Sequence, residues 1–149
     1  MKNKMLKKFL VVGIVLFFIF GLYICMHSYA NSQIINQYAV GFEKNALGDY
    51  CKNESGLVLS VYKASLFNIK TNLSVGGSDN DTALIVWVPL FGGEKEYGLI
   101  INDKKTETSY QIMVDEQLVP YDKEDEETIK GYQAHIAAIK AVAKKTWNL

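Results

Sequence analysis

The hydrophobic residues separate one long apolar segment near the N-terminus from a region in which apolar runs are short and interrupted by polar residues. The long segment begins at Phe9, ends at Met26 and contains eighteen consecutive residues without a charge. As an α-helix with a rise of about 1.5 Å per residue it covers about 27 Å, close to the ~30 Å hydrocarbon core of a bilayer. We therefore expect this segment to cross a membrane once.

Two further helices are indicated by apolar residues at spacings of three and four. Residues 32–47 form the first, which we expect to continue from the membrane segment, with Gly41 as a weak point and Gly48 at its end. The second covers residues from about 123 to 145, with acidic residues at its start and lysines near its end, as the helix dipole favours. Its apolar stripe predicts that Ile136 and Ile139 lie in the core.

β-branched and aromatic residues between these helices predict an antiparallel sheet of three or four strands. Residues 57–69 are typical of one long or two short strands, and residues 83–91, 97–101 and 109–114 of one strand each. Pro89 is expected at the end or the edge of its strand, because proline cannot donate to the ladder. Residues 49–56, 74–81 and 102–105 are expected to be loops. Connections this short between successive strands require antiparallel pairing.

The expected fold class is therefore α+β: a transmembrane helix, a helix, three or four antiparallel strands and a C-terminal helix, with the helices packed on the sheet. In the strand over residues 83–91, Trp87 shares one face with Ile85 and Pro89. The opposite face carries Leu84, Val86 and Val88. If helices cover one side only, one of these sets stays partly exposed. Tryptophan is over-represented among dominant interface residues, so we expect Ile85, Trp87 and Pro89 to form a partner-binding patch. The alternative is that Trp87 is buried in the core.

The distribution of charged residues predicts the orientation of the chain in the membrane. Four lysines precede the apolar segment with no acid among them, which places the N-terminus in the cytoplasm by the positive-inside rule. Residues 1–30 then form a Lys-rich cytoplasmic tip with a transmembrane anchor or uncleaved signal, and residues 31–149 an extracytoplasmic domain in a single-pass cell-membrane protein. Tyr23, His27 and Tyr29 suit the outer interface of the bilayer.

Two other fates of the N-terminal segment remain open. Signal peptidase accepts small residues at the positions that Ser28 and Ala30 occupy, so cleavage after Ala30 would release a secreted factor, such as an inhibitor or an interbacterial effector. The apolar length exceeds that of a usual signal peptide and favours the anchor. A lipoprotein attached through Cys25 is disfavoured by the bulky residues 22–24.

Composition excludes several classes of protein. The chain has no arginine, and residues 31–149 hold twelve lysines and all sixteen acidic residues, which argues against a nucleic-acid-binding protein. A hydrophobic content of 49% argues against disorder. Two cysteines, one of them in the apolar segment, are too few for a disulfide scaffold or a cysteine-built zinc site.

Candidate chemistry is sparse. Cys51 and His135 could form a catalytic pair, but nothing in their spacing brings them together, and we do not expect an enzyme. Residues 79–81, Asp-Asn-Asp, resemble the start of a calcium loop but lack the glycine and the closing glutamate, so no metal or cofactor is expected. Sequons occur at Asn53, Asn72 and Asn80, yet lysine in place of every arginine is typical of an AT-rich bacterium, in which they would stay unmodified.

Residues 82–89, TALIVWVP, resemble the T-A-L-x-V-W-V-P strand of the TseB-like proteins of Gram-positive bacteria. The resemblance implies a cystatin-like or PepSY-like α+β module outside the membrane, which regulates cell-wall elongation through a penicillin-binding protein. That family continues into further PepSY-like repeats, whereas residues 97–114 here predict additional strands. We therefore interpret the chain as a membrane-anchored module that binds an envelope protein, and the family offers no catalytic residues to carry over.

Overall fold

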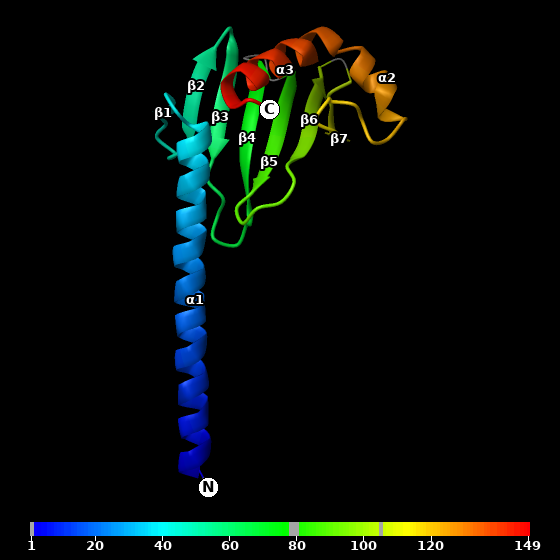
Figure 1. Ribbon diagram of the computed structural model, residues 1–149. Helices are drawn as coiled ribbons and strands as arrows, with labels where there is room; N and C mark the ends of the chain where they lie inside the picture. Colours follow the sequence, from blue (N-terminus) through cyan, green and yellow to red (C-terminus); the bar gives the residue numbers. More distant parts are fainter. Residues whose placement is uncertain (1, 78–80, 105) are drawn as a thin grey trace.

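The computed structural model describes residues 2–77, 81–104 and 106–149, and it has an α+β fold (Figure 1). A long helix, α1 (Lys2–Tyr38), precedes a seven-stranded antiparallel sheet, and two helices, α2 (Asp125–Lys130) and α3 (Gln133–Trp147), follow the sheet. The first half of α1 projects away from the sheet, and its last turns lie beside it (Figure 1). The expected α+β class is confirmed.

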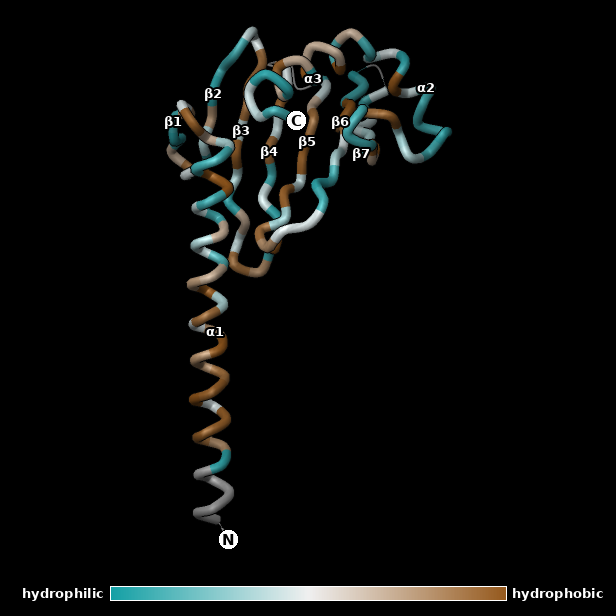
Figure 2. Tube along the Cα trace, in the orientation of Figure 1, coloured by the Kyte–Doolittle hydropathy of each residue, from teal (hydrophilic) through white to brown (hydrophobic). Residues whose placement is uncertain are grey.

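α1 is long and apolar enough over Lys8–Tyr38 to span a membrane. Its apolar side chains are exposed, Phe17 at 75% and Phe18 at 70%, and Figure 2 shows this hydrophobic band along the projecting part of the helix. As expected, the helix predicted to begin at residue 32 continues from the apolar segment without a break. The expected end near residue 47 is wrong, because the chain leaves the helix after Tyr38 and turns at Gly41, where φ is +75°.

The sheet is a simple meander in which every strand pairs with the next one along the chain. Antiparallel pairing is confirmed, but the sheet has seven strands where three or four were expected. The strands are β1 (Glu43–Lys44), β2 (Tyr50–Glu54), β3 (Leu57–Tyr62), β4 (Lys70–Gly77), β5 (Thr82–Pro89), β6 (Glu96–Asp103) and β7 (Thr108–Val114).

Parts of all three expected loops are strands, and in the third, β6 extends through Asn102 to Asp103. β2 reads YCKNE, and β4 extends through Ser74 to Gly77, where a loop was expected. β2 lacks an apolar run because it lies near the edge of the sheet, where none of its residues is fully buried. β4 alternates buried Leu73 and Val75 with polar residues, so its strand character depends on period two rather than on hydrophobicity.

The helices cover one face of the sheet. Side chains on that face are buried along the central strands, most of them at most 2% exposed. The C-terminal part of α1 packs beside them through Ile34, Ile35 and Tyr38. Trp147 at the end of α3 donates a hydrogen bond of 2.9 Å from Nε1 to the Tyr38 carbonyl, which joins the first helix to the last. The sheet residues buried here are Leu59, Val61, Leu73, Val75, Leu84, Val86, Leu99, Ile101, Ile112 and Val114.

The C-terminal helix is divided, which corrects the expectation of one helix over residues 123–145. α2 ends at Lys130, and Tyr132 (φ −120°, ψ 12°) leaves the helical region before α3 begins. The break redirects the chain so that α3 lies across β4 and β5. Ile136 and Ile139 are 7% and 1% exposed, which confirms both as core residues.

Candidate interaction face of the sheet

The face of the sheet opposite the helices carries apolar side chains that are only partly buried. Along β5, Leu84, Val86 and Val88 are buried beneath the helices, whereas Ile85, Trp87 and Pro89 are half-buried on the other side. The strand register places further apolar residues on this second side. We call this surface the open face. The same register places Asn72, Ser74 and the ion pair of Lys70 with Glu96 on it, and its apolar residues are Val58, Tyr62, Ile85, Trp87, Pro89, Ile100 and Met113.

Trp87 lies across the neighbouring strand at the centre of the open face. A Cβ atom built on Gly98 of β6 would lie 2.7 Å from Cη2 and 2.8 Å from Cζ3 of the indole. The ring therefore covers Gly98, which is buried although it faces away from the helices. Trp87 is thus neither in the main core beneath the helices nor fully exposed.

The structure groups the predicted patch residues and adds others that the sequence did not indicate. Ile85, Trp87 and Pro89 share the open face, but their role in binding a partner remains a prediction. Ile100 and Met113 were not singled out because their position beside β5 depends on cross-strand register, which the sequence does not reveal. The period of two in residues 109–114 was the available signal, since it already separates Met113 from Ile112 and Val114.

Cys51 and His135 lie on opposite sides of the sheet. Cys51 pairs with Ser60 across β2 and β3, and its Sγ lies 3.5 Å from Ser60 Oγ on the side of the open face. His135 projects from α3, which covers the other face. The sheet separates the two side chains, so they do not form a catalytic pair.

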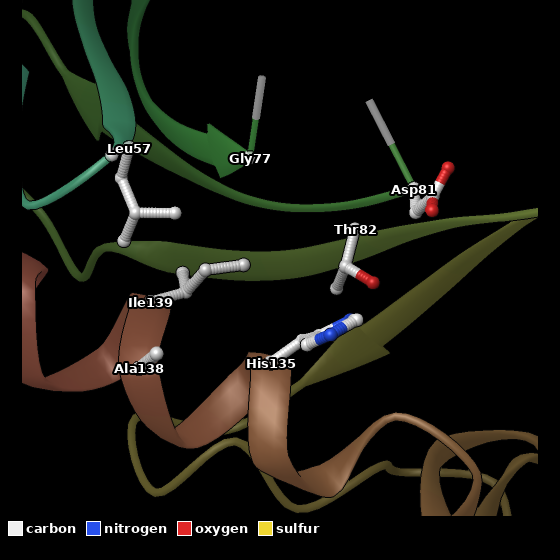
Figure 3. A pocket seen from close by; sticks show the side chains of 8 residues that line it. Leu57, Gly77, Asp81, Thr82, His135, Ala138 and Ile139 are labelled. Carbon is white, nitrogen blue, oxygen red and sulfur yellow. The ribbon is translucent and has the colours of Figure 1, made fainter. Parts of the chain in front are cut away.

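A small cleft of about 190 Å³ lies between α3 and the β2–β3 and β4–β5 ends of the sheet (Figure 3). Leu57, Ala138 and Ile139 supply apolar walls, and Thr82 and His135 supply polar groups. Asp81 at its rim is ion-paired to Lys104 at 2.6 Å. Within the described ranges, no group of three or more His, Cys, Asp or Glu residues could hold a metal ion. Residues 79 and 80 of the expected calcium-like turn, including the sequon Asn80, lie outside the described residues.

A polar ladder joins α1 to the connection between β3 and β4. The Tyr23 hydroxyl donates to the Leu66 carbonyl at 2.7 Å, and His27 Nε2 lies 2.9 Å from the Asn68 carbonyl. Asn31 is 8% exposed and bonds both to the Ala64 N–H (2.9 Å) and to the Ala64 carbonyl (3.1 Å). These three residues are four apart and therefore share one face of the helix, and this spacing was a signal that the sequence offered.

Ion pairs connect the end of α3 to β2. Lys145 and Lys52 lie 2.6 Å and 2.8 Å from the Glu54 carboxylate. Their hydrogen bonds, that of Lys145 foremost, lower the pKa of Glu54 from 4.5 to about 2. On β6, burial raises the pKa of the Tyr97 hydroxyl. Both groups face the helix side of the sheet, so the open face contains neither of them.

Comparison of the chain with protein-family models, curated proteins and solved structures finds no match. The resemblance to TseB-like proteins therefore remains an expectation based on residues 82–89.

Proposed function

We propose that this protein is a single-pass membrane-anchored module that presents the open face to an envelope protein outside the membrane. The observation that carries the proposal is the open face itself, where a tryptophan and several aliphatic side chains stay partly exposed on a seven-stranded sheet. Contiguous apolar surface on a folded domain is typical of an interaction site, and tryptophan is enriched among the residues that dominate binding energy.

The resemblance to TseB-like proteins supplies the class of partner, an enzyme of cell-wall synthesis that the module regulates. The positive-inside rule supplies the orientation, with the lysines before the apolar segment in the cytoplasm and the sheet outside. A binding module without its own chemistry agrees with the separation of Cys51 from His135 by the sheet.

Site-specific photocrosslinking in cells tests the proposal. A benzophenone amino acid is placed at Ile100 or Met113 on the open face, and at Glu126 on α2 as a control on the helix side. We expect one envelope protein to crosslink from both open-face positions and not from Glu126. Crosslinks from Glu126 alone, or crosslinks from the open face only to a second copy of this chain, would contradict the proposal.

A substitution separates binding from stability. Met113 is 38% exposed, so Met113→Lys adds a charge to the open face with little effect on the fold. It should abolish the crosslink from Ile100, because burying an unpaired charge in an apolar interface is costly. The matched control is Val119→Lys, at a residue 53% exposed in the connection between β7 and α2, and it should leave the crosslink unchanged.

The second candidate function is a secreted factor released by cleavage after Ala30. Its support is the small residues at positions 28 and 30. The polar ladder favours the anchored form, because cleavage there would remove Tyr23 and His27, two of the three side chains that hold the β3–β4 connection.

A further inference from the structure

Three large apolar side chains are exposed where the sheet approaches α1. Phe67 and Ile69, in the connection between β3 and β4, are 85% and 56% exposed, and Phe91, in the connection between β5 and β6, is 50% exposed. The Leu90 N–H donates to the Ile69 carbonyl at 2.8 Å, so the two connections lie side by side. Both are at the end of the sheet that points along α1 toward its N-terminus (Figures 1 and 2). We call Phe67, Ile69 and Phe91 the membrane-proximal tip.

The polar ladder fixes the height of this tip relative to α1. Leu66 is bonded to Tyr23, which lies inside the uncharged segment between Phe9 and Met26, and Asn68 is bonded to His27 just beyond it. Helix side chains tilt toward the N-terminus, so the Tyr23 hydroxyl lies no farther from the middle of the segment than its own Cα. A hydrocarbon core of ~30 Å that starts beside Lys8 ends near residue 28 at about 1.5 Å per residue. Phe67 and Ile69 are therefore level with the boundary between acyl chains and headgroups.

The backbone around the tip is suited to a medium poor in water. The Ala64, Leu66 and Asn68 carbonyls bond to side chains of α1, the Ser65 carbonyl accepts from the Asn68 N–H at 2.9 Å, and the Ile69 carbonyl accepts from Leu90. The Ala64 and Lys70 N–H groups donate to the side-chain oxygens of Asn31 and Asn68. An irregular segment can enter the apolar side of the interface only if its polar groups are paired within the protein. Five of the six carbonyls of residues 64–69 are paired in this way beside the exposed apolar side chains.

We propose that the membrane-proximal tip inserts into the interface of the same bilayer that α1 crosses, in the leaflet on the side of the sheet. This inference rests on the anchoring part of the proposed function and adds a second membrane contact to it. With α1 and the tip both held by lipid, the sheet has a fixed orientation, and the open face stands at a set angle to the membrane. The lipid interface is the occupant because the ladder brings the tip to its depth and aromatic rings are favoured there.

Depth-dependent fluorescence quenching of the full chain tests the insertion. In a background in which Cys25 and Cys51 are replaced by serine, a single cysteine at Phe67 or Ile69 is labelled with an environment-sensitive dye. The chain is reconstituted in vesicles of phosphatidylcholine and phosphatidylglycerol. The matched control is Leu47→Cys, since Leu47 is 88% exposed but lies in the turn between β1 and β2, beyond the C-terminal end of α1. A label at Phe17 reports the anchor.

We expect labels at Phe67 and Ile69 to show blue-shifted emission, quenching by spin-labelled lipid and protection from aqueous iodide. The label at Leu47 should show the opposite pattern. If the Phe17 label is quenched by lipid while both tip labels behave like the one at Leu47, the tip does not insert although the anchor stands. If the label at Phe17 is quenched by iodide and not by spin-labelled lipid, α1 does not cross the bilayer. The proposed membrane anchor and the insertion of the tip are then both contradicted. Circular dichroism of each variant checks that the fold is retained.

Discussion

At the scale of single residues, Asn31 determines the hydrogen-bond pattern of the polar ladder. The Ala64 N–H can only donate, so the atom that faces it at 2.9 Å is the Asn31 side-chain oxygen. The amide nitrogen then donates to the Ala64 carbonyl and, at 3.2 Å, to His27 Nδ1. His27 Nδ1 is therefore an acceptor, and Nε2 carries the proton donated to Asn68. One buried side chain thus fixes the tautomer of the next.

Replacement of this residue gives the first prediction. Asn31→Ala should lower the free energy of unfolding by about 2–3 kcal/mol, because the Ala64 N–H and carbonyl are left buried without partners. The control is Ser32→Ala, an exposed neighbour whose hydroxyl donates to Ser28 in its own helix, with an expected cost of about 0.5 kcal/mol or less. Denaturant titration of the full chain in detergent measures both, and equal effects would contradict the structural role of Asn31.

Gly98 provides the second prediction. Gly98→Ala should push the Trp87 indole out of its position, since the added Cβ would lie under 3 Å from two ring carbons, and should cost about 1–3 kcal/mol. The same substitution at Gly131, where φ is −65° and the nearest atom is the Thr128 carbonyl oxygen at 3.7 Å, should be neutral or stabilise by about 0.4–1 kcal/mol. Unfolding curves give both values. In a Trp147→Phe background only Gly98→Ala should change the emission of Trp87.

At the scale of elements, the sequence predicts those whose side chains carry a strong periodic signal. β5 and the stripe of α3 were placed closely because each buries a continuous apolar set. The sequence did not predict β2 or the end of β4. Both are strands because they pair with neighbouring strands, and neither has a continuous apolar run. For the same reason the sequence places Ile85 and Trp87 on one face but not Ile100 or Met113 beside them.

The contact between β2 and α3 supports a prediction about pH. A carboxylate whose pKa falls to about 2 in the folded protein contributes stability that is present above its ordinary pKa of 4.5 and is lost as the pH falls toward 2. Glu54→Gln should therefore lower the melting temperature modestly at pH 6, and the difference from the parent protein should shrink between pH 4.5 and 2. Lys145→Met should remove more of this pH dependence than Lys52→Met, because Lys145 is the larger cause. A difference that stays constant over this range would contradict the assignment.

At the scale of the whole molecule, α1 combines a segment long and apolar enough to span a membrane with a part that packs in the folded domain. The main core includes Ile34, Ile35 and Tyr38 of α1, and Trp147 donates a hydrogen bond to the Tyr38 carbonyl. The polar ladder extends the contact between α1 and the sheet domain to Tyr23. The sheet is thus held to the helix over about four turns rather than connected by a flexible linker. In the proposed membrane-anchored form, such a connection would transmit the tilt of the helix in the bilayer to the open face.

The last prediction concerns the integrity of this connection in cells. We expect the native protein to remain in the membrane fraction with residues 1–30 attached. The peptide bond after Ala30 lies inside the continuous helix α1, and Tyr23 and His27 hold this part of the helix against the folded domain. Peptidases cleave extended segments, so the folded helix should resist cleavage. Tyr23→Phe with His27→Ala should loosen this part and raise the released fraction, whereas Tyr29→Phe, at a residue 68% exposed, should not. Mass spectrometry of the membrane and medium fractions measures the outcome, and a native protein that begins at Asn31 in the medium would establish the secreted factor instead.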